Sequence, residues 1–141
     1  MNKLINYINQ ELAQFGFKLN PKENGREGVD FIVKIDNGNT HELYLQSLEL
    51  AKQREIKINK QHLGEPKDNL WIALVLYMEG KELKLFLIPS TTLLAPDDYI
   101  FKDYPQTEMF AHFANWEIKV FAEGMDKLNE YQLVNQVKNL I

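Results

Sequence analysis

Apolar residues recur at helical spacing near both ends of the chain. Near the N-terminus they stand three or four positions apart, and Gly16, a common helix stop, follows them directly. This first set is Leu4, Ile5, Ile8, Leu12 and Phe15. Near the C-terminus the spacing repeats behind Asp126, a candidate N-terminal cap, at Leu128, Tyr131, Val134, Val137 and Ile141. The pattern predicts an amphipathic helix at each end, with these residues buried.

Between the two helices, shorter segments carry the patterns of β-strands. Residues 29–35 alternate apolar and polar positions, and residues 40–48 return after Asn37-Gly38, a dipeptide typical of tight hairpins. Residues 70–78 form an almost continuous apolar run, which is typical of a central strand covered on both faces. Residues 83–88 follow after a short turn and are expected to pair with that run. The sequence therefore predicts two hairpins.

The remaining segments are less regular. Residues 17–19 are expected to be a short extended piece, and residues 116–121 a last short strand. Residues 95–105 are expected to be a loop, because they are rich in proline and aspartate. Residues 49–66 leave two interpretations open, a loop with one helical turn or a short strand at 56–58.

Length and composition place these elements in one α/β domain spanning residues 1–141. The chain has 141 residues, of which 45% are hydrophobic and 26% charged, which suits a single globule with a packed core. A small sheet with helices packed on it is the economical arrangement. There is no cysteine, which excludes disulfides and thiol catalysis and fits a reducing cytoplasm. No apolar run approaches the ~20 residues that span a bilayer, so no membrane association is expected.

One stretch of the sequence carries a recognisable pattern. Gly28-Val29-Asp30 leads through the turn at Asn37-Gly38 into Tyr44-Leu45-Gln46-Ser47-Leu48. This order resembles the core of the PD-(D/E)XK, or restriction-endonuclease-like, superfamily, in a bacterial branch where a Gly-x-Asp strand precedes Tyr-φ-Gln-φ-Lys-Ser, with φ apolar. The resemblance implies a mixed β-sheet flanked by N-terminal and C-terminal helices, with residues 70–75 and 87–90 in its next two strands.

The resemblance also implies a metal-dependent active site. In that superfamily two acidic or amide side chains hold a divalent metal, which activates water and stabilises charge on the phosphate. Carried over, Asp30 is the first Mg²⁺ ligand and Gln46 the second, and Glu11 could add a third carboxylate from the first helix. Plainer interpretations stay open: Asp30 as an outward residue at a strand start, Glu11 as a solvated helix flank, and Gln46 as a partner of neighbouring backbone. The implied metal site requires Asp30 and Gln46 to share one cleft.

The position of the catalytic lysine departs from the superfamily pattern. That lysine, two residues beyond the second ligand, positions water and offsets negative charge. In this sequence the position is occupied by Leu48, and the simplest interpretation is that its side chain belongs to the hydrophobic core. Losing such a charge usually costs orders of magnitude in rate. The sequence therefore favours a degenerate site with no enzymatic activity and no cofactor, and it leaves open an active Mg-dependent DNA nuclease in which Lys52 replaces the missing lysine.

The only dense positive stretch follows the strand that would carry the site. It contains Lys52, Arg54, Lys57, Lys60 and Lys67, with His62. Lys52, Arg54, Lys57 and Lys60 are the candidate nucleic-acid contacts, because lysine and arginine hold phosphates through salt-dependent contacts. A solvated loop is the other interpretation, since Glu55 and Glu65 dilute the charge. The net charge of −4 argues against a protein that coats nucleic acid.

These observations give one leading hypothesis and two rivals. The leading hypothesis is a non-catalytic nuclease-like domain that binds a nucleic-acid or protein partner, or a second copy of itself as a homodimer. The first rival is the active nuclease with the displaced Lys52. The second is a purely structural or interaction domain whose likeness to nucleases is only topological.

Overall fold

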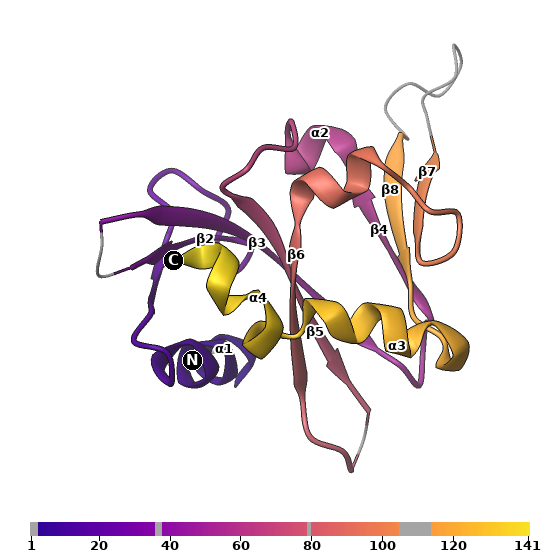
Figure 1. Ribbon diagram of the computed structural model, residues 1–141, viewed down its shortest axis with the longest axis horizontal. Helices are drawn as coiled ribbons and strands as arrows, with labels where there is room; N and C mark the ends of the chain where they lie inside the picture. Colours follow the sequence, from indigo (N-terminus) through magenta and orange to yellow (C-terminus); the bar gives the residue numbers. More distant parts are fainter. Residues whose placement is uncertain (1–2, 36–37, 79, 105–113) are drawn as a thin grey trace.

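The chain folds into two β-sheets with helices packed against them (Figure 1). The computed structural model describes residues 3–35, 38–78, 80–104 and 114–141. Their elements, in chain order, are α1 (Lys3–Ala13), β1 (Lys18–Pro21), β2 (Asp30–Lys34), β3 (Thr40–Glu49), β4 (Glu55–Asn59), α2 (Lys60–Leu63), β5 (Leu70–Tyr77), β6 (Lys84–Pro89), the 3-10 turn η1 (Ser90–Leu94), β7 (Phe101–Tyr104), β8 (Asn115–Lys119), η3 (Ala122–Gly124), α3 (Met125–Leu128), η4 (Asn129–Tyr131) and α4 (Leu133–Leu140). Over the described ranges, no helix has both the length and the apolar character needed to cross a membrane.

The larger sheet is mixed, which confirms an α/β architecture. Its strand order is β1-β2-β3-β5-β6, and the smaller sheet has the order β4-β8-β7. Both expected hairpins are present, because β2 pairs with β3 and β5 with β6 in antiparallel register. Strands β3 and β5 run parallel at the centre. Strand β5 is buried from Leu70 to Leu76, as its continuous apolar run predicts.

Side chains alternate between the two faces of the larger sheet and build two cores. On one face, Leu45 of β3 belongs to a cluster with Leu12 of α1 and Leu140 of α4. On the other face, Leu48 of β3 belongs to a cluster with Ile58 of β4. Helices α1 and α4 therefore cover one face of the larger sheet, and the smaller sheet covers the other (Figure 1).

The segment that the sequence left open contains both of the suggested elements. Strand β4 buries Ile56 and Ile58 and turns Glu55 and Lys57 to solvent. Helix α2 follows directly, and the Asn59 side chain caps it by accepting hydrogen bonds from two backbone N–H groups. The second half of the expected loop at 95–105 corrects the sequence prediction, because it forms strand β7, paired with β8.

The C-terminal segment is not one helix, which corrects the expected buried stripe. At Gln132 the backbone is extended, with ψ 146°, which ends the preceding helical turn. Helix α4 begins after it, so its buried positions do not continue the earlier spacing. The side chains that α4 buries are Leu133, Gln136 and Leu140. Val134 and Ile141, which the periodicity assigned to the core, are 64% and 68% exposed. Asp126 lies inside α3, whose N-terminal cap makes no side-chain hydrogen bond.

A buried histidine joins the two central strands to the last helix. Trp71 Nε1 of β5 donates to His41 Nδ1 of β3 over 2.9 Å, and His41 Nε2 lies 2.8 Å from the Leu140 carbonyl oxygen of α4. An indole nitrogen can only donate, so Nδ1 is the acceptor and Nε2 carries the hydrogen. The neutral imidazole thus satisfies both neighbours.

Asp97 holds the connection between η1 and β7. Its Oδ1 accepts the backbone N–H groups of Tyr99, Ile100 and Phe101, and the Lys127 ammonium of α3 lies against Oδ2. Burial alone would raise the pKa of this carboxyl, but Lys127 and the three N–H groups lower it from 3.8 to about 2. The ionised form is therefore favoured in the folded chain.

Asp97→Asn is expected to reduce the free energy of unfolding by about 2 kcal/mol at neutral pH, the equivalent of this pKa shift. Because the pKa is lowered on folding, the contribution is complete above about pH 4 and disappears as the pH falls to about 2. Urea unfolding at several pH values measures it. Asp98→Asn is the matched control, since Asp98 has φ 56°, which asparagine tolerates. Equal losses in the two variants at neutral pH would contradict this role for Asp97.

Candidate functional site

A loop between β1 and β2 brings Arg26 beside Asp30, the residue that the sequence pattern singled out. Asp30 begins β2 and lies opposite Tyr44 of β3. The loop turns tightly, because Gly28 has φ 76° and a Cβ at Gly25 would lie 2.7 Å from the Asp30 Cβ. Glycine at both positions lets the loop fold back over the start of β2.

Arg26 closes around the Asp30 carboxylate. Arg26 Nε donates to Oδ2 over 2.8 Å, Nη2 donates to Oδ1 over 3.0 Å, and the Arg26 backbone N–H donates to Oδ2 over 2.8 Å. Nη2 also donates to the His62 carbonyl over 2.7 Å, and the guanidinium carbon stands 5.1 Å from the centroid of the Tyr44 ring. Such two-pronged arginine–carboxylate pairs are the strong class of hydrogen bond. The carboxylate that the resemblance assigns to a metal is thus held by an arginine.

A second carboxylate lies on the same face of the hairpin. Glu42 stands two residues before Tyr44 on β3, so both side chains point to one side of the sheet. The Lys22 ammonium pairs with Glu42 Oε1, and the Lys67 ammonium lies 2.6 Å from Oε2. Lys22 follows β1 and Lys67 precedes β5, so Glu42 joins segments far apart in the sequence.

These five charged side chains line one cavity of about 190 Å³, which we call the charged pocket. The side chains of Lys22, Arg26 and Lys67 are 41%, 44% and 55% exposed, whereas those of Asp30 and Glu42 are 18% and 16% exposed. The three cations therefore stand at the rim and the two carboxylates lie beneath them. Glu65, which is exposed, also lines the cavity, so the formal charge of its acidic and basic side chains is zero, with the three cations among its most exposed groups.

The pocket keeps both carboxylates ionised. Partial burial would raise the pKa of Asp30, but the Arg26 hydrogen bonds and the Lys22 charge hold it below its usual value. Burial opposes ionisation of Glu42 in the same way, and its two lysine partners again lower the pKa. A general acid at neutral pH needs a carboxyl pKa that is raised. Neither carboxyl has the pKa that this role requires.

Gln46 does not join Asp30, although it lies on the same face of the sheet. Its Nε2 donates to the Leu45 carbonyl over 3.0 Å, which matches the plainer interpretation of backbone bonding. Gln46 lines a different cavity, of about 380 Å³, together with Gln53, Glu55 and Lys57. The structure thus places Asp30 and Gln46 in the linings of two different cavities.

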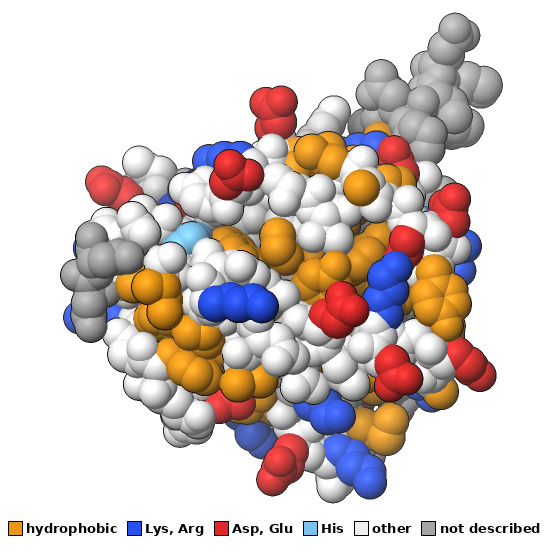
Figure 2. Space-filling view, viewed as in Figure 1, with side chains coloured by type: hydrophobic (Ala, Val, Ile, Leu, Met, Phe, Trp, Pro, Cys, Tyr) orange, Lys and Arg blue, Asp and Glu red, His pale blue; other side chains and the backbone are white. Residues whose placement is uncertain are grey.

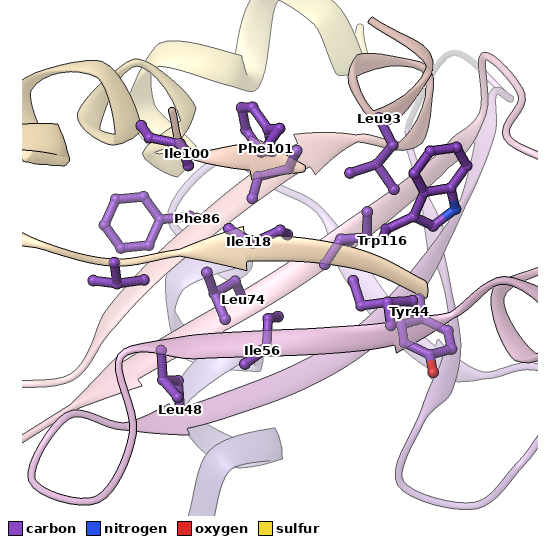
Figure 3. Packing of buried hydrophobic residues seen from close by; sticks show 14 of the residues in the cluster. Tyr44, Leu48, Ile56, Leu74, Phe86, Leu93, Ile100, Phe101, Trp116 and Ile118 are labelled. Atoms are coloured by element: carbon purple, nitrogen blue, oxygen red, sulfur yellow. The ribbon is translucent and has the colours of Figure 1, made fainter. Parts of the chain in front are cut away.

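Leu48 is part of the core between the two sheets. It is 1% exposed and belongs to the cluster that contains Ile56 and Leu74 (Figure 3). Figure 3 also shows Tyr44, four residues earlier on the same strand, with its hydroxyl pointing away from the other labelled side chains. The position of the superfamily lysine therefore faces apolar side chains.

Glu11 lies on the opposite side of the larger sheet from Asp30. It belongs to α1, and α1 packs against the face that Leu45 lines. Its carboxylate accepts a hydrogen bond from Gln14 Nε2 over 2.9 Å, and its Oε1 lies 3.1 Å from the Tyr7 hydroxyl oxygen. The structure does not bring Glu11 together with Asp30, because the larger sheet lies between them.

Lys52 also lies away from Asp30. Its ammonium is 3.1 Å from Glu49 Oε2. Glu49 is five residues beyond Tyr44, about 17 Å along the strand, and lines a cavity together with Leu4 of α1. The suggested replacement of the missing lysine by Lys52 does not fit this geometry.

The other candidate nucleic-acid contacts face different neighbours. Arg54 and Lys57 are exposed, and Lys57 lies opposite Glu117 of β8. Lys60 makes contacts within the protein. Its ammonium lies 4.1 Å from the centroid of the Trp116 ring and forms an ion pair with Asp103. Lys60 therefore anchors α2 on the smaller sheet.

The described residues do not suit the magnesium ion that the resemblance implies. Across residues 3–35, 38–78, 80–104 and 114–141, no group of three or more histidine, aspartate or glutamate side chains is placed to hold a metal ion. Asp30 is paired with Arg26, and Gln46 lines another cavity. A divalent cation at Asp30 would meet three positive side chains at close range.

The charged pocket depends on residues that sequence reasoning missed. Glu42 carried a usable signal, because it shares the strand parity of Tyr44 and Gln46. Arg26 stands four residues before Asp30, but only the fold of the glycine loop turns it onto that carboxylate. Lys67 was noted as part of the basic stretch, but local spacing holds no sign of its contact with Glu42.

The sequence was also compared with known proteins. No protein-family model matches this chain, and no curated protein matches its sequence.

Proposed function

We propose that this chain is a non-catalytic binding module that holds phosphate groups of a nucleic-acid strand in the charged pocket. The observation that carries the proposal is the position of Lys22, Arg26 and Lys67 at the rim, above their carboxylate partners. An ammonium has three N–H donors and a guanidinium five. Each cation can therefore keep its carboxylate and still donate to a phosphate oxygen.

We further propose that the scaffold is of the restriction-endonuclease-like kind. A mixed sheet flanked by the N-terminal helix α1 and the C-terminal helix α4 agrees with the arrangement that the resemblance implies. The separation of Asp30 from Gln46 and the core position of Leu48 support a scaffold that has lost its metal site.

A labelled single-stranded oligonucleotide is expected to bind with an affinity that falls as salt rises. Three cations on phosphates give a slope of log K against log salt of about −2. Lys22→Gln and Lys67→Gln should each weaken binding about fivefold, or about 1 kcal/mol. Glu42→Gln should strengthen binding, because it removes a negative charge beneath the rim. Fluorescence anisotropy measures all three effects.

Lys18→Gln is the matched control for these variants. Lys18 is an exposed lysine of β1 that does not line the charged pocket. The control should bind as tightly as the unmodified chain. A complex that is insensitive to salt, or equal losses for Lys18→Gln and Lys22→Gln, would overturn the proposal.

The same protein is expected to leave DNA intact. Plasmid and single-stranded DNA incubated with it in Mg²⁺ or Mn²⁺ should show no new fragments on a gel, since Asp30 is paired with Arg26 and Gln46 lies in another cavity. Cleavage that disappears in Asp30→Ala would establish the active nuclease instead. The loss in that variant separates activity of this chain from a contaminating nuclease.

A further inference from the structure

The three cations of the charged pocket converge on one small volume. The Lys22 and Lys67 ammoniums lie on the two oxygens of a single carboxylate, that of Glu42. The Lys22 backbone N–H donates to the Asp30 carbonyl over 3.0 Å, and Arg26 holds the Asp30 carboxylate, so all three cations surround the same stretch of the β2–β3 hairpin. A single group that enters the pocket can therefore contact all three.

The inner wall of the charged pocket is apolar. Leu63 of α2 and Leu70 of β5 line it, and both are buried in the core cluster that contains Leu48. The cavity therefore ends against the core instead of continuing as a channel. An internal phosphodiester has chain on both of its sides, whereas a terminal phosphate has chain on one side only. The closed inner wall thus favours a group that stands at the end of a chain.

The charges and donors of the pocket suit a phosphate monoester. At neutral pH a monoester carries a charge of about −1.5 to −2 and three terminal oxygens, whereas an internal diester carries a single negative charge and two free oxygens. The acidic and basic side chains of the pocket balance, so the ligand gains mainly from the cations that it contacts directly. The ligand with the larger charge, and with one oxygen for each of the three cations, gains the more.

Basic side chains elsewhere on the molecule are largely interspersed with acidic ones. Figure 2 shows this mixture over the face that it views. In the basic stretch after β3, Lys52 pairs with Glu49 and Lys60 with Asp103. The net charge of the chain is −4. Affinity for a strand is therefore expected to come mainly from the phosphate in the charged pocket, and less from phosphates farther along the strand.

The cavity next to the charged pocket favours a nucleic acid over a phosphorylated peptide as the source of this phosphate. Tyr44 lines the charged pocket, and Gln46, two residues later on the same face of β3, lines the next cavity together with Gln53. Two residues span about 7 Å of a strand. Glutamine amides both donate and accept hydrogen bonds, and they pair with the edges of bases. A nucleotide joined to the bound phosphate can therefore place its base at these amides.

We propose that the charged pocket binds the terminal phosphate monoester of a nucleic-acid strand, with Lys22, Arg26 and Lys67 each donating to one of its oxygens. This role rests on the proposed function and adds which phosphate of the strand is held. The rest of the strand leaves over the rim toward Gln46 and Gln53. The same group occurs at a 5′ end and at a 3′ end, so the test includes both.

Competition measured by fluorescence anisotropy tests the proposal, with short single-stranded oligonucleotides of one sequence that carry a 5′-phosphate, a 3′-phosphate or hydroxyls at both ends. At least one phosphorylated form is expected to bind about tenfold more tightly than the dihydroxyl form, and that form identifies the end that is held. Lys22→Gln and Lys67→Gln should each reduce this preference about threefold, because the monoester loses a charged donor. Lys18→Gln, outside the pocket, should keep it. The preference is a ratio within one variant, so a partly unfolded sample would not imitate its loss.

Equal affinity for the three oligonucleotides, with salt-dependent binding that Lys22→Gln weakens, would overturn recognition of the end while leaving the phosphate-binding module in place. Absence of salt-sensitive binding for all three would overturn both proposals. A phosphoserine peptide added as a competitor should displace the phosphorylated oligonucleotide only at a much higher concentration. Displacement at the same concentration would overturn a nucleic-acid ligand and assign the pocket to a phosphorylated protein.

Discussion

Leu48→Lys is expected to reduce the free energy of unfolding by about 3 kcal/mol or more. The side chain is 1% exposed among apolar residues of both sheets, so lysine would bring an uncompensated charge into the core and remove leucine packing. The variant restores the residue type of the superfamily pattern, yet we expect no cleavage, because Asp30 stays paired with Arg26. Urea unfolding and a Mg²⁺ cleavage assay measure the two effects.

Leu48→Met is the control for this experiment. Methionine keeps the apolar character and nearly the volume of leucine, and such exchanges usually cost less than about 1.5 kcal/mol. A Leu48→Lys protein as stable as the methionine variant would show that this position opens to solvent. Metal-dependent cleavage by the Leu48→Lys variant would show that the site at Asp30 lacked only the lysine ammonium for nuclease activity.

Trp71→Phe is expected to destabilise the chain by about 3 kcal/mol. The change removes the indole N–H that His41 Nδ1 accepts and leaves a gap where the larger ring was. The loss reaches beyond one hydrogen bond, because His41 also contacts the Leu140 carbonyl and so connects β3 to α4. Thermal and urea unfolding measure the change.

A double-mutant cycle separates the hydrogen bond from the packing. His41→Phe, Trp71→Phe and the double variant should show a coupling of about 1 kcal/mol or more, since each single change leaves one partner of the His41–Trp71 hydrogen bond unsatisfied and the double change removes both partners, while the loss of the His41 contact with Leu140 is common to both variants that lack His41 and cancels in the cycle. Additive losses would mean that the two side chains only fill space.

Much of the fold follows from periodicity, because regular burial leaves regular patterns. The alternation in residues 29–35 and the apolar run of residues 70–78 correspond to β2 and β5. The C-terminal helix shows where periodicity fails. Spacing predicted the burial of Val134. However, the backbone at Gln132 is extended and forms a β-bridge with Phe86 of β6. The helix that follows therefore begins in a new orientation, and different residues face the core. That contact is tertiary and has no signature in the local spacing.

The candidate site was less predictable than the fold. The sequence pattern selected Asp30 and Gln46 by likeness to a superfamily, and the register places both on one face of the hairpin. What decides their chemistry is Arg26, which the glycine loop turns onto Asp30. Lys60 shows the same limit, because a residue in a basic stretch became a packing partner of Trp116. Charge along a chain does not specify which ion pairs form.

An NMR titration of the ¹⁵N-labelled chain with a short single-stranded oligonucleotide, in the presence of Mg²⁺, tests the central claim most directly. We expect the amide signals of the Lys22–Asp30 loop and of the segment from His62 to Lys67 to shift together, while the oligonucleotide stays whole. Two results would contradict the proposal that the charged pocket holds phosphate without cutting it. One is binding of the oligonucleotide with no change in the chemical shifts of those amides, and the other is cleavage of the oligonucleotide into fragments.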